Sequence, residues 1–242
     1  MKKLKRKHIL FLLLVLALLA YPFRGRLRSG AIGMLQVLRG RKTVAQRVQQ
    51  YGDAVRARLA PEFERIGVAY PPTRIILVAF KQERLLEVWV SDNDTSFTLL
   101  TAYPILGLSG RLGPKLAEGD NQVPEGLYRI ESLNPNSLYH LSLRLDYPNE
   151  FDTAKARFDG RENLGTDIMI HGNTCSIGCL AMGDEASEDL FVLAAETGIQ
   201  NVSVIISPVD FRLRGLPVHM SAVPRWTPEL YEPIRTELAK LN

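Results

Sequence analysis

Short segments with the two-residue period of β-strands fill the middle of this 242-residue chain. The segments 74–80, 85–91 and 97–105 are rich in β-branched and aromatic residues, and polar turn residues separate them. Four more segments share this pattern: 126–133, 138–145, 167–172 and 201–208. Seven strands with few helices predict a mainly β (α+β) domain built around one core.

Helical patterns flank these strands. Apolar residues recur at spacings of three and four through 44–66, where Pro61 is expected to kink or divide the helix. We expect Asp184 to be the N-cap of a second helix that ends near Thr197, and a polar helix over 228–241. The residues Asn134–Ser137 are predicted to form a hairpin turn.

The charge is divided unevenly along the chain. Residues 1–42 carry eleven Lys/Arg and no acidic residue, which leaves 19 Lys/Arg against 26 Asp/Glu in the remaining 200 residues. The folded part is therefore net acidic, and a nucleic-acid-binding surface on it is not expected. We expect a monomer.

The basic N-terminus begins with five Lys/Arg and continues as an uninterrupted apolar run, Ile9–Tyr21. This order is typical of a secretory signal, so we expect export. Leu18 is large for the −3 position of a cleavage site after Ala20. The basic residues before the run favour a cytoplasmic N-terminus. We therefore expect an uncleaved signal-anchor in the inner membrane, with a cleaved signal peptide and a soluble protein as the alternative.

The two cysteines of the chain lie beside a histidine in the stretch "IHGNTCSIGC". Cys175 and Cys179 could form a disulfide, although so small a loop removes little entropy from the unfolded chain. A metal site would use His171 with both cysteines and would lack an obvious fourth ligand. In the third interpretation Cys179 is a nucleophile and His171 its base. Local chemistry leaves all three interpretations open.

The order of "IHG" and "SIGC" resembles the His-Gly … Ser-x-Gly-Cys signature of the L,D-transpeptidase catalytic-domain (YkuD-type) family. The flanking stretches 109–130 and 139–152 resemble the YafK-like branch of that family, and the resemblance covers roughly residues 74–207. It implies an L,D-transpeptidase-like β-sandwich catalytic domain with an N-terminal helical segment and a few peripheral helices.

The resemblance also implies roles for the residues of the motif. Cys179 would be the nucleophile, His171 the general base, and Gly172 would orient the imidazole through its carbonyl group. Ser176 would shape the loop, and the N–H groups of Cys179 and Gly178 would form the oxyanion hole. The reaction would be acyl transfer through a thioester on peptidoglycan stem peptides in the periplasm, without a metal or other cofactor.

Two alternatives remain beside L,D-transpeptidation. The loop between His171 and Cys179 is shorter than in many family members, and this favours an amidase that hydrolyses the diaminopimelate–lipoprotein linkage and so releases wall-linked lipoprotein. The alternative of another class is a non-catalytic cell-wall-binding protein with a Cys175–Cys179 disulfide. The expected organisation is a signal peptide or signal-anchor (1–28), a basic linker and amphipathic helix (29–72), the catalytic domain (73–208) and a C-terminal extension with a helix (209–242).

Other polar residues are weaker candidates for substrate binding. They are His140, Arg111, Arg129 and Asn173, followed by the loop residues Lys115, Glu118 and Asp120. We expect His219 to be structural.

Overall fold

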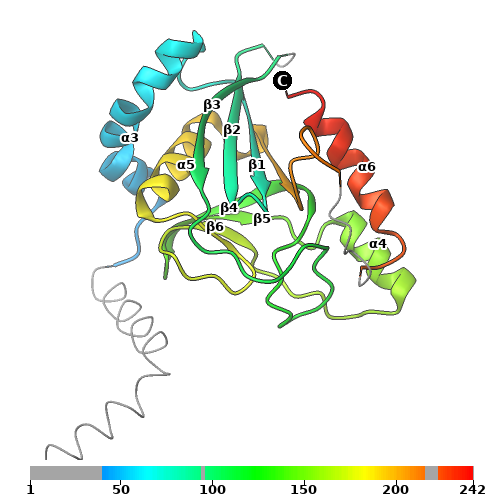
Figure 1. Cartoon of the computed structure of the whole chain (residues 1–242). Coiled ribbons are helices and arrows are strands. Elements are labelled where there is room, and N and C mark those ends of the chain that lie inside the picture. The colour runs from blue at the N-terminus through cyan, green and yellow to red at the C-terminus, as the bar shows by residue number, and fades with distance from the viewer. Residues whose placement is uncertain (1–39, 94–95, 216–222, 242) are drawn as a thin grey trace, which may run out of the picture. The chain divides into compact units, whose positions relative to one another are not determined.

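The structure, a computed structural model, describes residues 40–93, 96–215 and 223–241 (Figure 1). The expected signal segment and His219 lie outside these residues. Residues 42–241 belong to one compact unit. No helix of the described residues is long and apolar enough to cross a membrane.

Eight strands form one sheet in the order β3-β2-β1-β8-β4-β5-β6-β7. They are β1 (Arg74–Phe80), β2 (Leu85–Ser91), β3 (Thr98–Pro104), β4 (Gly126–Ser137), β5 (His140–Leu145), β6 (Met169–His171), β7 (Leu180–Ala181) and β8 (Val202–Ser207). β1 pairs with β8 and β6 with β7 in parallel, and the other neighbours are antiparallel.

Strand β4 joins the two halves of this sheet. Its first residues, Gly126–Arg129, pair with β8, and the stretch from Ile130 to Ser137 pairs with β5. The sheet curls at β4, so that the β4-β5-β6 half lies below the β3-β2-β1 half in Figure 1. The predicted mainly β fold is confirmed.

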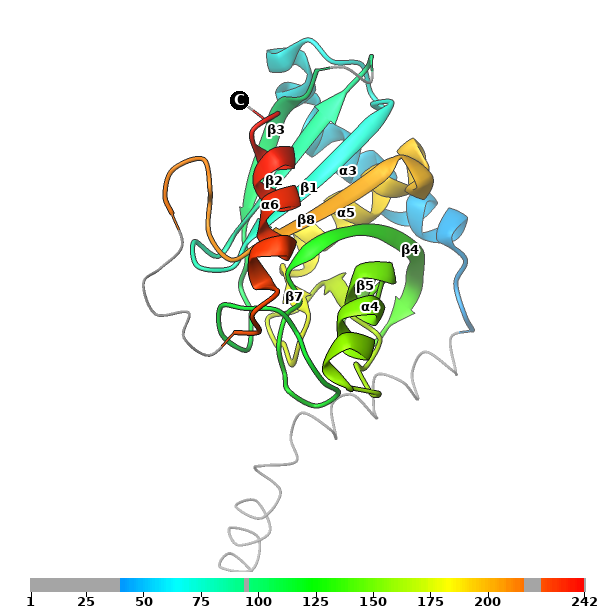
Figure 2. The same cartoon turned by 90° about the vertical axis from the view of Figure 1, so that its right-hand side faces the viewer.

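Helices cover both faces of the β1-β8 region. The helices α3 (Val44–Ile66) and α5 (Asp184–Thr197) lie on one side, and α6 (Thr227–Leu238) lies on the other above α4 (Glu150–Asp159) (Figures 1 and 2). A short 3₁₀ turn, η2 (Ile199–Asn201), precedes β8.

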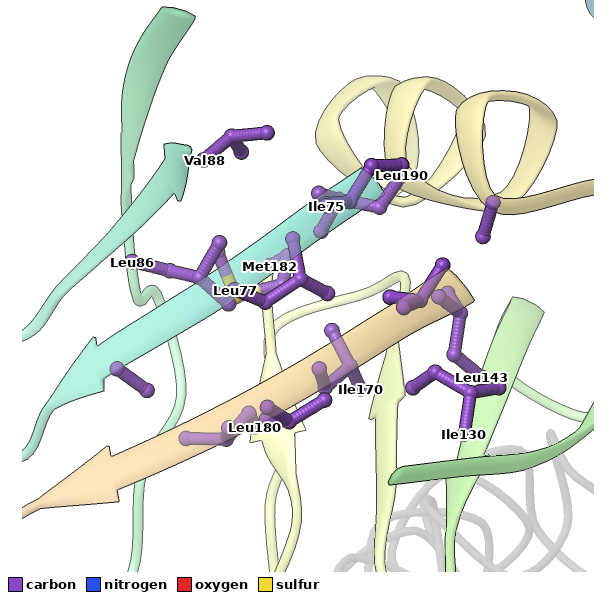
Figure 3. Packing of buried hydrophobic residues seen from close by; sticks show 14 of the residues in the cluster. Ile75, Leu77, Leu86, Val88, Ile130, Leu143, Ile170, Leu180, Met182 and Leu190 are labelled. Carbon is purple, nitrogen blue, oxygen red and sulfur yellow. The ribbon is translucent and has the colours of Figure 1, made fainter. Parts of the chain in front are cut away.

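The alternation of side chains along β1 explains the two apolar clusters between these layers. Ile75 and Leu77 face the main cluster with α3 and α5, and Val78 and Phe80 face a second cluster with α6. Figure 3 shows the main cluster, in which Leu190 of α5 approaches Ile75.

Several local predictions were wrong. Asn134–Ser137 is not the hairpin turn, because β4 runs on to Ser137 and a register irregularity between Asn134 and Ser137 accommodates the proline. Asp184 is the first helical residue rather than the N-cap, which is Gly183. Of the two outcomes expected at Pro61, a kink or a division, the division is wrong, because α3 runs through Pro61 without a break. Helix α4 and strand β7 were not predicted.

Candidate active site

The parallel pair β6–β7 joins the two ends of the histidine–cysteine motif. Ile170 pairs with Leu180, and His171 pairs with Ala181. Ile170 and Leu180 are fully buried and point into the main cluster (Figure 3). His171 is the last residue of β6 and Cys179 immediately precedes β7, so the strand pairing places the two residues on neighbouring segments.

His171 is 2% exposed, and its Nδ1 lies 2.6 Å from the carbonyl oxygen of Gly172. A carbonyl oxygen only accepts, so Nδ1 carries the proton and Nε2 is left as the basic nitrogen. Burial lowers the pKa of His171, and the hydrogen bond to Gly172 opposes this only in part. The imidazole is therefore neutral at pH 7, as a general base must be.

Gly172 is a position without room for a side chain. A Cβ there would lie 2.6 Å from the Oδ1 of Asp184 and 2.8 Å from the carbonyl oxygen of Tyr139. The same Asp184 Oδ1 accepts a hydrogen bond from the N–H of Asn173 at 2.8 Å. The first turn of α5 thus fixes the backbone that follows His171. Asn173, a predicted substrate-binding residue, is exposed, but its side chain accepts a hydrogen bond from the N–H of Thr174.

Cys179 is partly exposed, and its thiol donates a hydrogen bond to the carbonyl oxygen of Asp167 at 3.6 Å. Burial raises the pKa of Cys179; the backbone N–H of Met169 opposes the rise, and the Asp167 carboxylate adds to it. Cys179 is therefore a neutral thiol at pH 7, and its proton is directed to the carbonyl oxygen of Asp167.

Two serine hydroxyls occupy the N–H groups expected to form the oxyanion hole. Ser176 Oγ accepts a hydrogen bond from the N–H of Cys179 at 3.1 Å and donates to the carbonyl oxygen of Cys179 at 2.6 Å. Ser109 Oγ accepts from the N–H of Gly178 at 2.7 Å and lies 3.3 Å from Ser176 Oγ. Both N–H groups expected to form the oxyanion hole are thus hydrogen-bonded to serine hydroxyls in this structure.

Ser109 belongs to a segment that the sequence analysis did not place in the site. The N–H groups of Leu106 and Gly107 both donate to the carbonyl oxygen of Ala181, and the N–H of Ala181 donates back to Gly107. A Cβ on Gly107 would collide with the carbonyl group of Thr174. The segment 106–109 therefore packs directly on the nucleophile loop. The "SGRLG" stretch within the family resemblance was the available signal.

The structure places the weaker candidates for substrate binding in different surroundings. His140 Nε2 lies 2.9 Å from Glu188 Oε1, and its ring packs against Tyr51, so its ring is held by α5 and α3 instead of facing a substrate. Arg111 is exposed on the loop that carries Ser109, and its guanidinium has no partner among the described residues. Arg129 lines a different cavity of about 700 Å³ beside α6.

The loop residues beyond Arg111 mainly hold their own loop together. Lys115 Nζ lies 2.5 Å from Asp120 Oδ1 and donates to the carbonyl oxygen of Ala117. Asp120 also accepts hydrogen bonds from backbone N–H groups, and these interactions lower its pKa although burial opposes them. Glu118 is exposed, and its carboxylate lies against Gly165.

The two other interpretations of the cysteines find no support in the geometry. Both cysteines are free thiols. Within the described part of the chain, no three His, Cys, Asp or Glu side chains are grouped so that they could hold a metal ion.

Residues 73–206 match the model of the YkuD family, described as the L,D-transpeptidase catalytic domain. YafK of Escherichia coli strain K12, whose name assigns it to the L,D-transpeptidases, is 34% identical over 139 residues, which are 55% of this chain and 54% of YafK. The chain thus spans about half the length of this curated relative.

Solved structures resemble the chain in part. The helical cell shape determining protein Pgp2 of Campylobacter jejuni is 22% identical with a TM-score of 0.45, over 56% of this chain and 48% of Pgp2. Bd1075 of Bdellovibrio bacteriovorus is 20% identical with a TM-score of 0.40, over 69% of this chain and 55% of Bd1075. At these scores the likeness carries no argument about function.

Proposed function

Because this chain belongs to the YkuD family of L,D-transpeptidase catalytic domains, we propose that it acts on peptidoglycan by acyl transfer through a thioester on Cys179. The observation that supports the proposal is the pairing of β6, which ends at His171, with β7, which begins directly after Cys179, together with the neutral imidazole of His171. A thiol and a base on neighbouring segments of a rigid sheet are what nucleophilic catalysis at a carbonyl group requires.

The proposed reaction begins with attack of Cys179 Sγ on the carbonyl carbon of an amide at the L-centre of the stem's diamino acid. The thiol proton moves to His171 Nε2 as the S–C bond forms. The C–N bond then breaks, and the imidazolium returns the proton to the leaving amine. A second amine attacks the thioester in transpeptidation, whereas water attacks it in hydrolysis.

The serine hydroxyls suggest how the site admits a substrate. The N–H groups of Cys179 and Gly178 become available to the oxyanion only when Ser176 and Ser109 release them. Substrate binding would therefore open the oxyanion hole, which is the feature that stabilises the tetrahedral intermediate. Arg111 is exposed on the loop of Ser109 and its guanidinium has no partner in the described part of the chain, so it is our candidate to bind a carboxylate of the stem peptide.

Hydrolysis that releases wall-linked lipoprotein is the second candidate function. Only seven residues separate His171 from Cys179, so little chain is available to form a lid that excludes water from the thioester. Cys175, within this short loop, is exposed.

We also propose where in the cell the protein acts. The apolar run 9–21 would direct export, and we propose a catalytic domain in the periplasm that the uncleaved segment anchors to the inner membrane.

The test is to incubate the purified protein with muropeptides and with peptidoglycan carrying covalently attached lipoprotein, and to resolve the products by mass spectrometry. Dimers joined through two diamino acids would support transfer, and freed lipoprotein without new cross-links would support hydrolysis. Cys179→Ala should be inactive, and the matched control Cys175→Ser should retain most activity. Absence of both products with reduced wild-type protein would refute the proposal.

A further inference from the structure

The turn between β4 and β5 packs directly on the histidine of the site. The ring centroids of Tyr139 and His171 lie 4.8 Å apart with an angle of 31° between the planes. We propose that Tyr139 is a positioning residue that fixes the orientation of the His171 imidazole and shields it from water. This inference rests on the proposed function, in which His171 is the general base.

Tyr139 contacts both parts of the His171–Gly172 unit. Its ring lies against the imidazole, and its carbonyl oxygen lies 2.8 Å from the point where a Cβ of Gly172 would be. The carbonyl group of Gly172 in turn holds Nδ1 of the imidazole. One hydrogen bond leaves a ring free to rock about the bonded nitrogen, and a stacked neighbour removes that freedom.

The turn that carries Tyr139 is itself firmly held. The N–H of Tyr139 donates to Ser137 Oγ at 3.1 Å. The next residue, His140, has a positive φ of 73°, a conformation that costs energy outside glycine and persists only where neighbours enforce it. Glu188 of α5 binds the ring of His140, and Tyr51 of α3 packs edge-on against it at 5.3 Å. These contacts fix the position from which Tyr139 reaches His171.

Burial, and not a neighbouring charge, sets the pKa of His171. Loss of water is the main cause that lowers it, the hydrogen bond to Gly172 acts against it, and no charged side chain contributes. The surrounding elements carry these titratable residues: His140 and Arg144 of β5, Asp184, Glu185, Glu188, Asp189 and Glu196 of α5, Asp167 before β6, and Cys179 before β7. Removing the Tyr139 ring should therefore change the protonation of His171 through exposure to water.

Nuclear magnetic resonance titration of His171 tests this without any substrate. In a Cys179→Ala background, Tyr139→Ala should raise the pKa of His171 toward its ordinary value of 6.5, and Tyr139→Phe should leave it as in the parent. The resonance is assigned with a His171→Gln variant. The control is Phe158→Ala, which removes an exposed ring on α4 outside these contacts and should not move this pKa.

Kinetics with Cys179 present give the second readout. Tyr139→Ala should lower kcat at least tenfold and shift the acid limb of the kcat/KM profile to higher pH, and Tyr139→Phe should restore both. If the alanine variant does not fold, Tyr139→Leu replaces it, and kcat should again fall because an aliphatic side chain does not orient the ring. An unchanged pKa and kcat in the folded variant would overturn the inference. A shifted pKa in a protein inactive on all peptidoglycan substrates would instead count against the proposed function.

Discussion

At the scale of single residues, burial changes the two central pKa values in opposite directions. It raises the pKa of the Cys179 thiol and lowers the pKa of the His171 imidazole. Both groups are therefore neutral at pH 7, and the free site holds no thiolate–imidazolium pair. In the proposed mechanism, the thiol becomes a nucleophile only when His171 accepts its proton during attack on a bound carbonyl group.

This protonation state predicts slow alkylation of the nucleophile in the free protein. In Cys175→Ser, where Cys179 is the one thiol left, the rate of reaction with iodoacetamide should be low at pH 7. It should rise to an inflection above the ordinary thiol pKa of 9.0. In Cys179→Ala the exposed Cys175 should react faster at pH 7. Rapid alkylation of Cys179 with an inflection below pH 7 would show a preformed thiolate and contradict this assignment.

The hydroxyl of Ser176 bridges the N–H and the carbonyl group of the nucleophile, so its removal should affect catalysis more than stability. Loss of two hydrogen bonds at about 1 kcal/mol each loosens the loop that holds Cys179, and predicts that Ser176→Ala lowers kcat/KM by up to roughly 30-fold although it frees the N–H of Cys179. Thr174→Ala in the same loop, where the hydroxyl makes only a 3.5 Å contact, is the control. Steady-state kinetics would measure both, and equal rates in the two variants would rule out this role.

At the scale of elements, the sequence predicts the helices and strands along which apolar residues repeat regularly, and it misses those without such a repeat. Apolar residues repeat along β1 and α3, and both were predicted. Helix α4 buries only Ala156 and so lacks an apolar stripe, although Asn149 begins it with a capping box. The hairpin turn was misplaced because Asn-Pro-Asn is typical of turns, whereas an irregular pairing register keeps these residues in β4.

Only the site residues that lie close together in the sequence could be predicted. His171, Gly172 and Cys179 belong to one short motif, so its spacing was enough to single them out. Tyr139 and Ser109 reach the same place through the β4–β5 turn and the loop before β4. Their contribution depends on tertiary packing, which no spacing in one sequence records.

The first turn of α4 predicts a dependence of stability on pH. Burial raises the pKa of Asp152 from 3.8 to about 6, and its hydrogen bonds with Asn149 and Tyr128 oppose this. The folded state thus favours the protonated carboxyl of Asp152. Protonation of Asp152 therefore stabilises the folded state, and this contribution is complete below pH 3.8 and is lost as the pH rises through about 6.

Asp152→Asn should remove this pH-dependent contribution to the free energy of unfolding. Relative to the wild type, the variant should gain free energy of unfolding between pH 4 and pH 7.5, by up to roughly 3 kcal/mol, as measured by urea unfolding at both pH values. The difference between the two proteins cancels the other titrating groups. A difference that does not grow with pH would contradict the raised pKa.

At the scale of the whole molecule, a buried ion pair joins β1, the loop before β4 and α6. Lys81 Nζ lies 2.9 Å from Glu125 Oε1, and both side chains are fully buried. Tyr231 of α6 donates to Glu125 Oε2 at 2.6 Å, and the N–H of Gly113 donates to Oε1. Burial lowers the pKa of Lys81, and Glu125 opposes this.

Breaking this network from one side should be more costly than removing it. Lys81→Met leaves a buried carboxylate without its cation, which predicts a loss of roughly 3–5 kcal/mol in the free energy of unfolding. Lys81→Met combined with Glu125→Gln leaves no unpaired charge and should cost less than the single change. Urea unfolding measures both. A double variant that is less stable than Lys81→Met would show that Lys81 and Glu125 do not stabilise the fold through their ion pair.

The charge division of the whole chain leads to the last prediction, which concerns location. All eleven basic residues of 1–42 lie around an apolar run without an acidic residue, and the remaining chain has seven more acidic than basic residues. Five of these basic residues precede the run, which favours their retention in the cytoplasm and translocation of the acidic part.

Fractionation should place the protein in the inner membrane, resistant to carbonate extraction, and protease added to spheroplasts should degrade residues 43–242. Neutralising the five leading Lys/Arg should weaken this orientation, whereas neutralising Arg39, Arg41 and Lys42, which lie far behind the run, should not. Soluble periplasmic protein whose mass begins near Tyr21 would refute the anchor and leave export standing.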